Sequence, residues 1–170
     1  MRVLGIDPGT RITGFGCVEG DRDRPCLIDA GVFRLLKVSK ELGPRLVELE
    51  RDLDKLLAEL RPDVVAIEGL FVHYKHPATA IVMGHARGVI VLAVQRAGPE
   101  LVELKPAEVK KSLVGHGQAS KAQMQDAIQH QFGLDSRPEP ADVADALAIA
   151  LCALRRPTIE IDDPLARIAP

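Results

Sequence analysis

Residues 3–18 read VLGIDPGTRITGFGCV, and this stretch decides the fold because two apolar runs flank a sequence typical of a turn. Val3–Ile6 is the first run, Asp7–Thr10 interrupts it with a proline and a glycine, and Gly14–Val18 is the second run. Short apolar runs bounded by such residues are typical of strands joined by turns. A further run, Cys26–Leu35, predicts a third strand. We therefore expect three strands in hairpin succession.

The segment from Lys40 to Leu60 is predicted to be a helix with one apolar stripe. Its leucines recur at spacings of three and four, with charged residues between them. These leucines are Leu42, Leu46, Leu49, Leu53, Leu56 and Leu60. The next apolar run, Val64–Ile67, ends at Glu68 and predicts a buried strand. A strand that follows a helix is expected to pair in parallel with the first strand.

The rest of the chain is predicted to be mostly helical. The expected elements are a helix over Pro77–Ala97, a strand over Leu101–Leu104, and helices over Pro106–Leu113, Ser120–Phe132 and Pro140–Leu154. Pro106 suits the first turn of a helix, and Ser120 suits an N-cap. The predicted order, β-β-β-α-β-α-β-α-α-α, places the protein in the α/β class.

Length and composition indicate one compact domain. The chain has 170 residues, 46% of them apolar, and 22 basic against 24 acidic side chains, for a net charge of -2. We expect a single domain over residues 1–156 and a flexible tail over residues 157–170. The longest apolar run, Gly88–Val94, is too short to span a membrane, and the N-terminus lacks the pattern of a signal peptide. We therefore expect a cytoplasmic protein with no membrane partner.

Three cysteines, Cys17, Cys26 and Cys152, fit neither a zinc-ligand spacing nor an even disulfide set. All three are expected to be buried thiols.

The near-neutral net charge conceals two basic segments. Residues 71–97 carry three basic side chains and no acid, and residues 105–121 carry four lysines against one glutamate. The lysines of the second segment are Lys105, Lys110, Lys111 and Lys121. Both segments could follow a phosphate backbone, or they could be ordinary solvated faces.

Four carboxylates are the candidate catalytic groups. Asp7 and Glu68 each close an apolar strand, and Asp142 and Asp145 lie three residues apart on one face of a predicted helix. Each acid alone has an ordinary explanation: a turn residue, an exposed strand end, or an acid at a helix N-terminus. Together they suit a hard cation such as Mg²⁺ or Mn²⁺, and two such ions would support phosphoryl transfer.

Five motifs resemble, in order and spacing, the RuvC family of Holliday junction resolvases. The motifs are Ile6–Thr10 with Thr13–Gly16, Ile67-Glu68 with Phe71, Gly84–Gly88, Gly115–Gln123 and Ala141–Ala148. The resemblance covers roughly residues 1–154. It implies a ribonuclease-H-like fold, with a five-stranded mixed sheet and helices on both faces. It also implies a homodimeric endonuclease that cuts four-way DNA junctions during recombination and repair, together with the RuvA–RuvB branch-migration complex.

The resemblance also implies roles for individual residues. Asp7, Glu68, Asp142 and Asp145 fall on the metal-binding catalytic acids of the family, and Lys121 falls on a lysine near the scissile phosphate. Phe71 falls on an aromatic residue that stacks on bases at the junction, although it could instead fold onto the core. The further candidates for DNA contact are Lys75, Lys110 and Lys111.

Two other functions remain open from the sequence. The Asp-Pro-Gly-Thr turn at residues 7–10 also resembles the actin-like ATPases, although those proteins need two related domains around the nucleotide. A dimeric junction-binding protein with purely structural acids is the non-catalytic alternative. Within the predicted helix Pro77–Ala97, Ala80, Gly84 and Gly88 recur every four residues. This spacing predicts close packing of two such helices in a dimer, whether the protein cuts junctions or only binds them.

Overall fold

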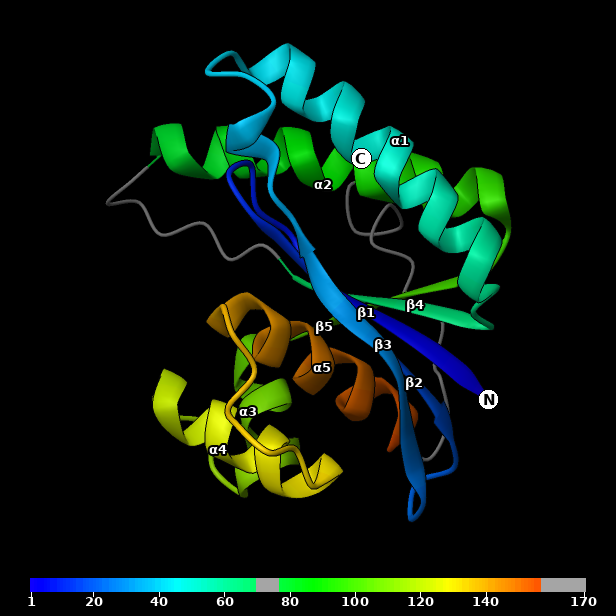
Figure 1. Ribbon diagram of the computed structural model, residues 1–170, viewed down its shortest axis with the longest axis vertical. Helices are drawn as coiled ribbons and strands as arrows, with labels where there is room; N and C mark the ends of the chain where they lie inside the picture. Colours follow the sequence, from blue (N-terminus) through cyan, green and yellow to red (C-terminus); the bar gives the residue numbers. More distant parts are fainter. Residues whose placement is uncertain (70–76, 157–170) are drawn as a thin grey trace, which may run out of the picture.

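A single five-stranded mixed sheet forms the centre of the protein in a computed structural model that describes residues 1–69 and 77–156 (Figure 1). The strands are β1 (Arg2–Asp7), β2 (Thr13–Gly20), β3 (Pro25–Phe33), β4 (Val64–Glu68) and β5 (Glu100–Leu104). Their order across the sheet is β3-β2-β1-β4-β5. The first three strands pair as antiparallel hairpins, whereas β4 pairs in parallel with both β1 and β5. The predicted hairpin succession and the predicted parallel pairing are both confirmed.

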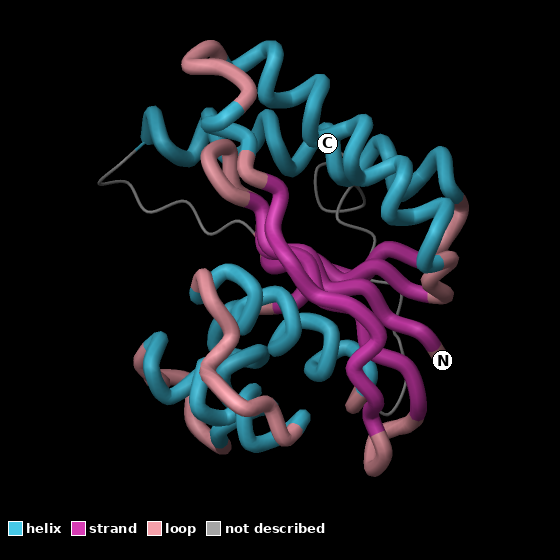
Figure 2. The backbone as a smooth tube through the Cα atoms, viewed as in Figure 1, coloured by secondary structure: helices cyan, strands magenta, loops and turns pink. Residues whose placement is uncertain are grey.

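Helices cover both faces of the sheet (Figure 2). Helices α1 (Leu42–Leu60) and α2 (Pro77–Ala97) pack on one face, and α3 (Pro106–Val114), α4 (Lys121–Phe132) and α5 (Ala141–Leu154) lie on the other. The predicted order of elements and the predicted fold class are confirmed. The structure adds a short 3₁₀ helix, η1 (Leu35–Lys37), where the third strand was expected to continue. The turn places Leu35, fully buried, in the core cluster shared by α1 and the sheet.

Helix α1 follows its leucine pattern. Leu49, Leu53, Leu56 and Leu60 are buried, whereas Leu42 and Leu46 near its start are only partly covered. The helix ends at Arg61, whose left-handed backbone (φ 45°) caps it through an N–H bond to the carbonyl of Leu57.

Helix α5 lies directly on the backbone of β1 and β2 because glycines line the sheet beneath it. A Cβ atom at Gly5 would lie 2.2 Å from the carbonyl oxygen of Ala146, and a Cβ atom at Gly14 would lie 2.2 Å from the carbonyl oxygen of Asp142. No residue with a side chain fits at these positions without moving the helix. The missing side chains therefore bring the first turn of α5 against the ends of the central strands.

Helix α2 has apolar residues on two faces. Ala86, Ile90, Ala93 and Val94 are buried against α1 and the sheet, whereas the side chains on the outer face are open to solvent. Within the described residues, α2 is the one helix long and apolar enough, by length and composition alone, to cross a membrane. A search for uninterrupted apolar runs does not detect it, because His85, Arg87 and Arg96 interrupt those runs. The helix is this apolar because its outer face carries apolar side chains in contact with solvent, in addition to those on the face that packs on the core.

The prediction of three buried cysteines is wrong at one position. Cys17 and Cys152 are buried, and burial raises the pKa of both thiols. Cys26 is exposed, because β3 is an edge strand and alternate side chains of an edge strand face solvent.

Candidate active site

Asp7 and Glu68 lie side by side at one edge of the sheet. They end β1 and β4, which run parallel in a register that pairs Ile6 with Ile67. Because Asp7 and Glu68 each follow one of these paired isoleucines, the two carboxyl groups leave the sheet next to each other. Neither is fully buried, although every residue from Val3 to Ile6 and from Val64 to Ile67 is.

Helix α5 brings the other two acids to the same edge. Asp142 and Asp145 are half-buried and share one face of the helix, while all its other residues from Val143 onward are buried. The predicted division of this helix into an acidic face and a core face is confirmed. The contact between Gly14 and the backbone of Asp142 fixes where the acidic face begins.

Three of the four acids line one cleft together with two lysines. The cleft has a volume of about 300 Å³, and its ionisable lining residues are Asp7, Glu68, Asp145, Lys110 and Lys121. Asp142 lies at the rim instead, where it lines a neighbouring groove. The structure therefore brings together most of the acids and lysines that the sequence singled out.

The carboxyl groups of this cleft raise one another's pKa. Burial, followed by the charges of Asp145, Glu68 and Asp142, raises the pKa of Asp7 from 3.8 to about 7. Burial and the charge of Asp145 also raise the pKa of Glu68, while Lys110 and Lys121 oppose the shift. The pKa of Asp145 is raised mainly by burial. Holding this many carboxylates together costs folding free energy unless a positive charge compensates for it.

The donor set fits a hard divalent cation. All the converging ligands are carboxylate oxygens, which Mg²⁺ and Mn²⁺ prefer, and their mutual repulsion is the cost that such an ion would offset. Across residues 1–69 and 77–156, no three His, Cys, Asp or Glu side chains lie close enough together to hold one ion as they stand. Metal binding by these acids therefore requires their side chains to turn towards one another, while the backbone already places them at one edge.

The raised pKa of Asp7 predicts a pH-dependent effect of its removal. Well below pH 3.8 the carboxyl group is protonated in both folded and unfolded chains, so Asp7→Asn should leave the metal-free stability unchanged. Between pH 3.8 and about pH 7 the unfolded chain has lost this proton while the folded chain still holds it. The free energy of unfolding of wild type therefore falls as the pH rises through this range, whereas that of Asp7→Asn does not fall for this reason. Above pH 7 we expect the variant to be the more stable, by about 4 kcal/mol at most.

Thermal unfolding in EDTA across this pH range measures the effect. Asp23→Asn removes an exposed acid from the β2–β3 turn, at the other end of the sheet, and should show no such trend. Added Mg²⁺ should stabilise wild type and not Asp7→Asn. A stability difference that does not change with pH would contradict the electrostatic account.

Lys121 approaches the acids from the start of α4. Its Nζ lies 3.8 Å from Oδ2 of Asp145, while its side chain remains 77% exposed. A lysine in the first turn of a helix opposes the helix dipole, and the capping box of Ser120 and Gln123 already stabilises that turn. The positive charge of Lys121 is therefore better explained by its contact with the acids of the cleft than by any stabilisation of α4. Lys110 also lines the cleft, but Lys111, the next residue of α3, is exposed and lies outside it.

Arg87 is a positioning residue that the sequence did not single out. It donates a hydrogen bond of 3.2 Å to the carbonyl oxygen of Glu68 and forms an ion pair with Glu103 of β5. These contacts hold the end of β4, from which the Glu68 side chain extends. The signal in the sequence was the segment Gly84–Gly88, a motif of the resemblance in which Arg87 had no individual role assigned.

The first basic segment is largely neutralised in the part of the chain that the structure describes. Arg87 pairs with Glu103, and Arg96 pairs with Glu50 at 2.6 Å. Phe71 and Lys75, the other candidates for DNA contact in this segment, lie outside the described residues.

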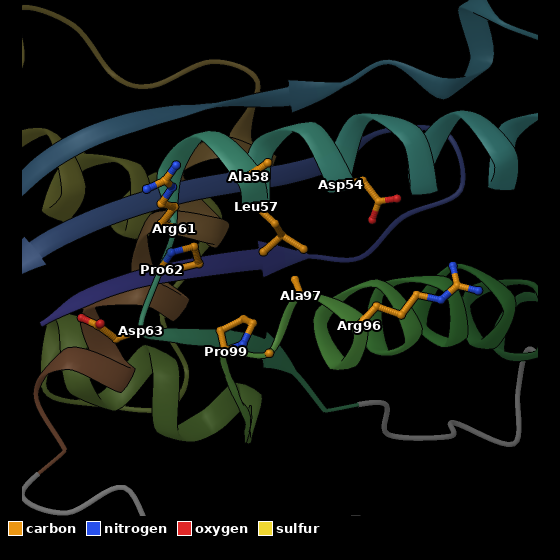
Figure 3. Close-up of a pocket in the computed structure, with 10 residues that line it drawn as sticks. Asp54, Leu57, Ala58, Arg61, Pro62, Asp63, Arg96, Ala97 and Pro99 are labelled. Atoms are coloured by element: carbon orange, nitrogen blue, oxygen red, sulfur yellow. The ribbon is translucent and has the colours of Figure 1, made fainter.

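A larger hollow, of about 730 Å³, lies at the opposite end of the sheet (Figure 3). Arg61, Asp63 and Arg96 line it, between the last turns of α1 and α2 and the starts of β4 and β5. Two of these polar groups already have partners: Asp63 accepts a hydrogen bond from the backbone N–H of Arg2, and Arg96 is paired as described above. The carboxylate cleft is therefore the better candidate for chemistry.

The sequence of this chain is similar to those of proteins described as crossover junction endodeoxyribonucleases. The family model described as crossover junction endodeoxyribonuclease RuvC matches residues 3–153. The crossover junction endodeoxyribonuclease RuvC of Rhodopirellula baltica is 46% identical over 164 residues, which cover 96% of this chain and 92% of that protein.

Solved structures agree with the sequence matches. The structure described as T. thermophilus RuvC in complex with Holliday junction substrate superposes with a TM-score of 0.81 at 32% identity, covering 89% of this chain and 92% of that one. The yeast mitochondrial Holliday junction resolvase Ydc2, at 19% identity and a TM-score of 0.66, shares the fold over 90% of this chain and 77% of its own. With most of its length matched by the family model and by a close relative, the chain belongs to the RuvC family of crossover junction endodeoxyribonucleases.

Proposed function

We propose that this protein resolves four-way DNA junctions by hydrolysing phosphodiester bonds in the cleft formed by Asp7, Glu68 and Asp145. The observation that carries the proposal is the convergence of these acids with Lys110 and Lys121 at one edge of the sheet. Family membership supplies the substrate class, since a RuvC relative has been solved with a Holliday junction. The catalytic unit proposed is a single domain over residues 1–156.

The acids would hold divalent metal ions, on which RuvC-family nucleases depend. Asp7, Glu68, Asp142 and Asp145 are the proposed ligands, with Mg²⁺ or Mn²⁺ as the ion and two ions per subunit. When bound, the ions would activate a water molecule and offset the charge that develops on the leaving oxygen. Lys121 would stabilise the negative charge of the scissile phosphate, and Lys110 would hold the strand beside it. The proposed products carry a 3′-hydroxyl and a 5′-phosphate.

A cleavage assay on a synthetic four-way junction tests the proposal. We expect cleavage with Mg²⁺, none with EDTA, and little on a linear duplex of the same sequence. Binding of the junction without EDTA-sensitive cleavage would instead indicate a non-catalytic junction-binding protein. Hydrolysis of a nucleoside triphosphate without junction cleavage would indicate the ATPase alternative.

The kinetic effect of Lys121 is expected to differ from that of its neighbours on α3. Lys121→Ala should lower the single-turnover cleavage rate by about 10- to 100-fold, with a smaller decrease in affinity, because its cation acts on charge that grows in the transition state. Lys110→Ala and Lys111→Ala should mainly lower affinity and the salt dependence of binding. Single-turnover cleavage and a salt titration of binding separate the two effects. Equal decreases in rate and affinity at Lys121 would count against its catalytic role.

We propose that the active form is a C2 homodimer that joins through α2. A four-way junction must be nicked on two symmetry-related strands, and a two-fold dimer places two active sites accordingly. The outer face of α2 supports this arrangement, since Ile81 is 64% exposed and Leu92 is 48% exposed. Within the described chain, no atom lies within 4 Å of a Cβ added at Gly84 or Gly88, so packing there does not require glycine. Glycine inside a helix costs about 1 kcal/mol relative to alanine, which favours a role in close packing against a second copy.

Gly84→Arg is expected to convert the dimer to a monomer and to leave only unpaired nicks. The long side chain would separate the two helices without disturbing the monomer, because it points into open space. Gly43→Arg, at an equally open position near the start of α1, is the matched control and should stay dimeric. Sedimentation at micromolar concentration measures the change. A monomeric wild type would contradict the dimer outright.

The protein is further proposed to act in the cytoplasm, on junctions that the RuvA–RuvB complex has brought to the site of cleavage. Family membership supports this setting, since RuvC-family nucleases act on DNA. Co-sedimentation of the chain with RuvA–RuvB assembled on a junction would test it.

A further inference from the structure

A second groove, of about 590 Å³, adjoins the catalytic acids. Three separate parts of the chain form its walls: the β1–β2 loop at residues 9–12, the segment 34–37 after β3, and the start of α2 at Thr79 and Met83. Asp142, one of the proposed catalytic acids, also lines the groove. We call it the basic groove, because Arg11, Arg34 and Lys37 line it.

Hydrogen bonds hold together two walls of the basic groove, the β1–β2 loop and the segment 34–37. The hydroxyl of the fully buried Thr13 donates to the carbonyl oxygen of Gly9 at 2.6 Å and closes the β1–β2 loop. The N–H of Leu36 donates to the carbonyl oxygen of Arg11 at 3.3 Å, and Arg45 of α1 donates to that of Thr10 at 3.2 Å. The groove is therefore a formed part of the fold and not a gap between loose loops.

The three cations of the basic groove form no ion pair within the part of the chain that the structure describes. Arg11, Arg34 and Lys37 are all exposed, and within residues 1–69 and 77–156 none lies within 4.0 Å of a carboxylate oxygen. Three like charges around one hollow, with no ion pair in the described chain to balance them, give the groove a positive potential. Such a surface attracts an anionic ligand, and Asp142 is the one acid among the described residues of its lining.

The position of the groove indicates which anion it takes. Lys110 and Lys121 line the cleft that holds Asp7, Glu68 and Asp145, and the fourth acid, Asp142, lines the basic groove. A polyanionic strand whose scissile phosphate lies on the acids would therefore lie near the cations of both the cleft and the groove. Among the described residues that line the groove none is aromatic, so these walls offer charge to a backbone and no surface for stacking a base.

We propose that the basic groove binds the phosphates of the DNA strand that continues from the scissile phosphate, through Arg11, Arg34 and Lys37. This inference rests on the proposed nuclease function and names a part of the substrate path. Phosphate contacts position a strand without reading its sequence, so the groove contributes affinity and register equally for all sequences.

The test is the salt dependence of junction binding in EDTA, which prevents cleavage. The double variant Arg11→Ala/Arg34→Ala should bind a four-way junction about 10-fold or more weakly. The slope of log affinity against log salt should fall by about 2 for each groove that contacts the junction, since each phosphate that is no longer neutralised removes about 0.9 from it. Arg11→Lys/Arg34→Lys should restore most of the slope, because it keeps the charges.

The matched control is Arg22→Ala/Arg24→Ala. It removes the same charge from exposed positions in the β2–β3 turn, at the other end of the sheet. The control should keep the wild-type slope. A wild-type slope in the groove variant, or an equal decrease in both double variants, would overturn the inference.

Failure of the groove can be told apart from failure of the nuclease function. If wild type cleaves junctions with Mg²⁺ but the groove variant keeps the wild-type slope, the groove alone is refuted. If wild type neither binds nor cleaves a junction, the proposed function fails first.

Discussion

Replacing Asp7 by asparagine is expected to abolish junction cleavage while junction binding stays close to that of wild type. The change removes a proposed metal ligand at the point where the two central parallel strands end, and it adds no bulk. Several kcal/mol of transition-state stabilisation depend on the metal site, so single-turnover cleavage should fall by about 10³-fold or more. Binding should survive because it depends on the basic side chains around the cleft.

The inactivity of Asp7→Asn cannot be attributed to misfolding if the variant is as stable as wild type, or more stable, above pH 7. Glu68→Gln and Asp142→Asn should behave in the same way, and Asp145→Asn should also be severely impaired. Asp23→Asn is the control for the removal of one acid and should cleave normally. Full cleavage by Asp7→Asn, Glu68→Gln or Asp142→Asn under wild-type metal conditions would refute the assignment of the site.

Gly14→Ala is expected to lower both the free energy of unfolding and the rate of cleavage. A Cβ at this position would lie 2.2 Å from the carbonyl oxygen of Asp142 and 2.7 Å from its carbonyl carbon, so the first turn of α5 must move. Overpacking of this kind typically costs about 1–3 kcal/mol. Because Asp142 would move with the turn, cleavage by Gly14→Ala should fall by about 10²-fold even when the chain is folded.

Gly43→Ala is the matched control for Gly14→Ala. Gly43 lies in the first turn of α1, and no atom of the described residues lies within 4 Å of an added Cβ there. This variant should be neutral or more stable by up to about 1 kcal/mol, with full activity. Thermal unfolding and single-turnover cleavage of both variants measure the contrast. A Gly14→Ala variant as stable and active as wild type would show that α5 does not set the position of Asp142.

Local patterns were enough to predict the elements and half of the site. The leucine spacing of α1 and the apolar runs of β1 and β4 depend only on neighbours in the sequence. Asp7 and Glu68 were expected to be adjacent because parallel strands end at the same edge of a sheet, and the register of β1 and β4 confirms it. Here the chemistry follows directly from the positions at which two strands end.

Features that depend on distant parts of the chain could not be predicted in this way. The sequence overstated the free positive charge of the segment that holds Arg87 and Arg96, because their acidic partners lie on other elements. Counting charges along the sequence also missed the basic groove, whose cations come from segments separated by more than twenty residues. The close approach of α5 to Gly5 and Gly14 is likewise visible only once the helix is in place.

The packing of α5 on the glycines of β1 and β2 affects the order in which the protein folds during synthesis. During synthesis, β1 emerges early, yet the helix that covers it comes after every other helix and strand that the structure describes. Contacts between such distant segments form late and slowly, because a long loop must close before they are made. The helix that completes the interior also delivers Asp142 and Asp145, so burial of the core and assembly of the cutting site are one event. A chain in which α5 has not yet been made and packed onto the sheet therefore lacks a complete set of these acids.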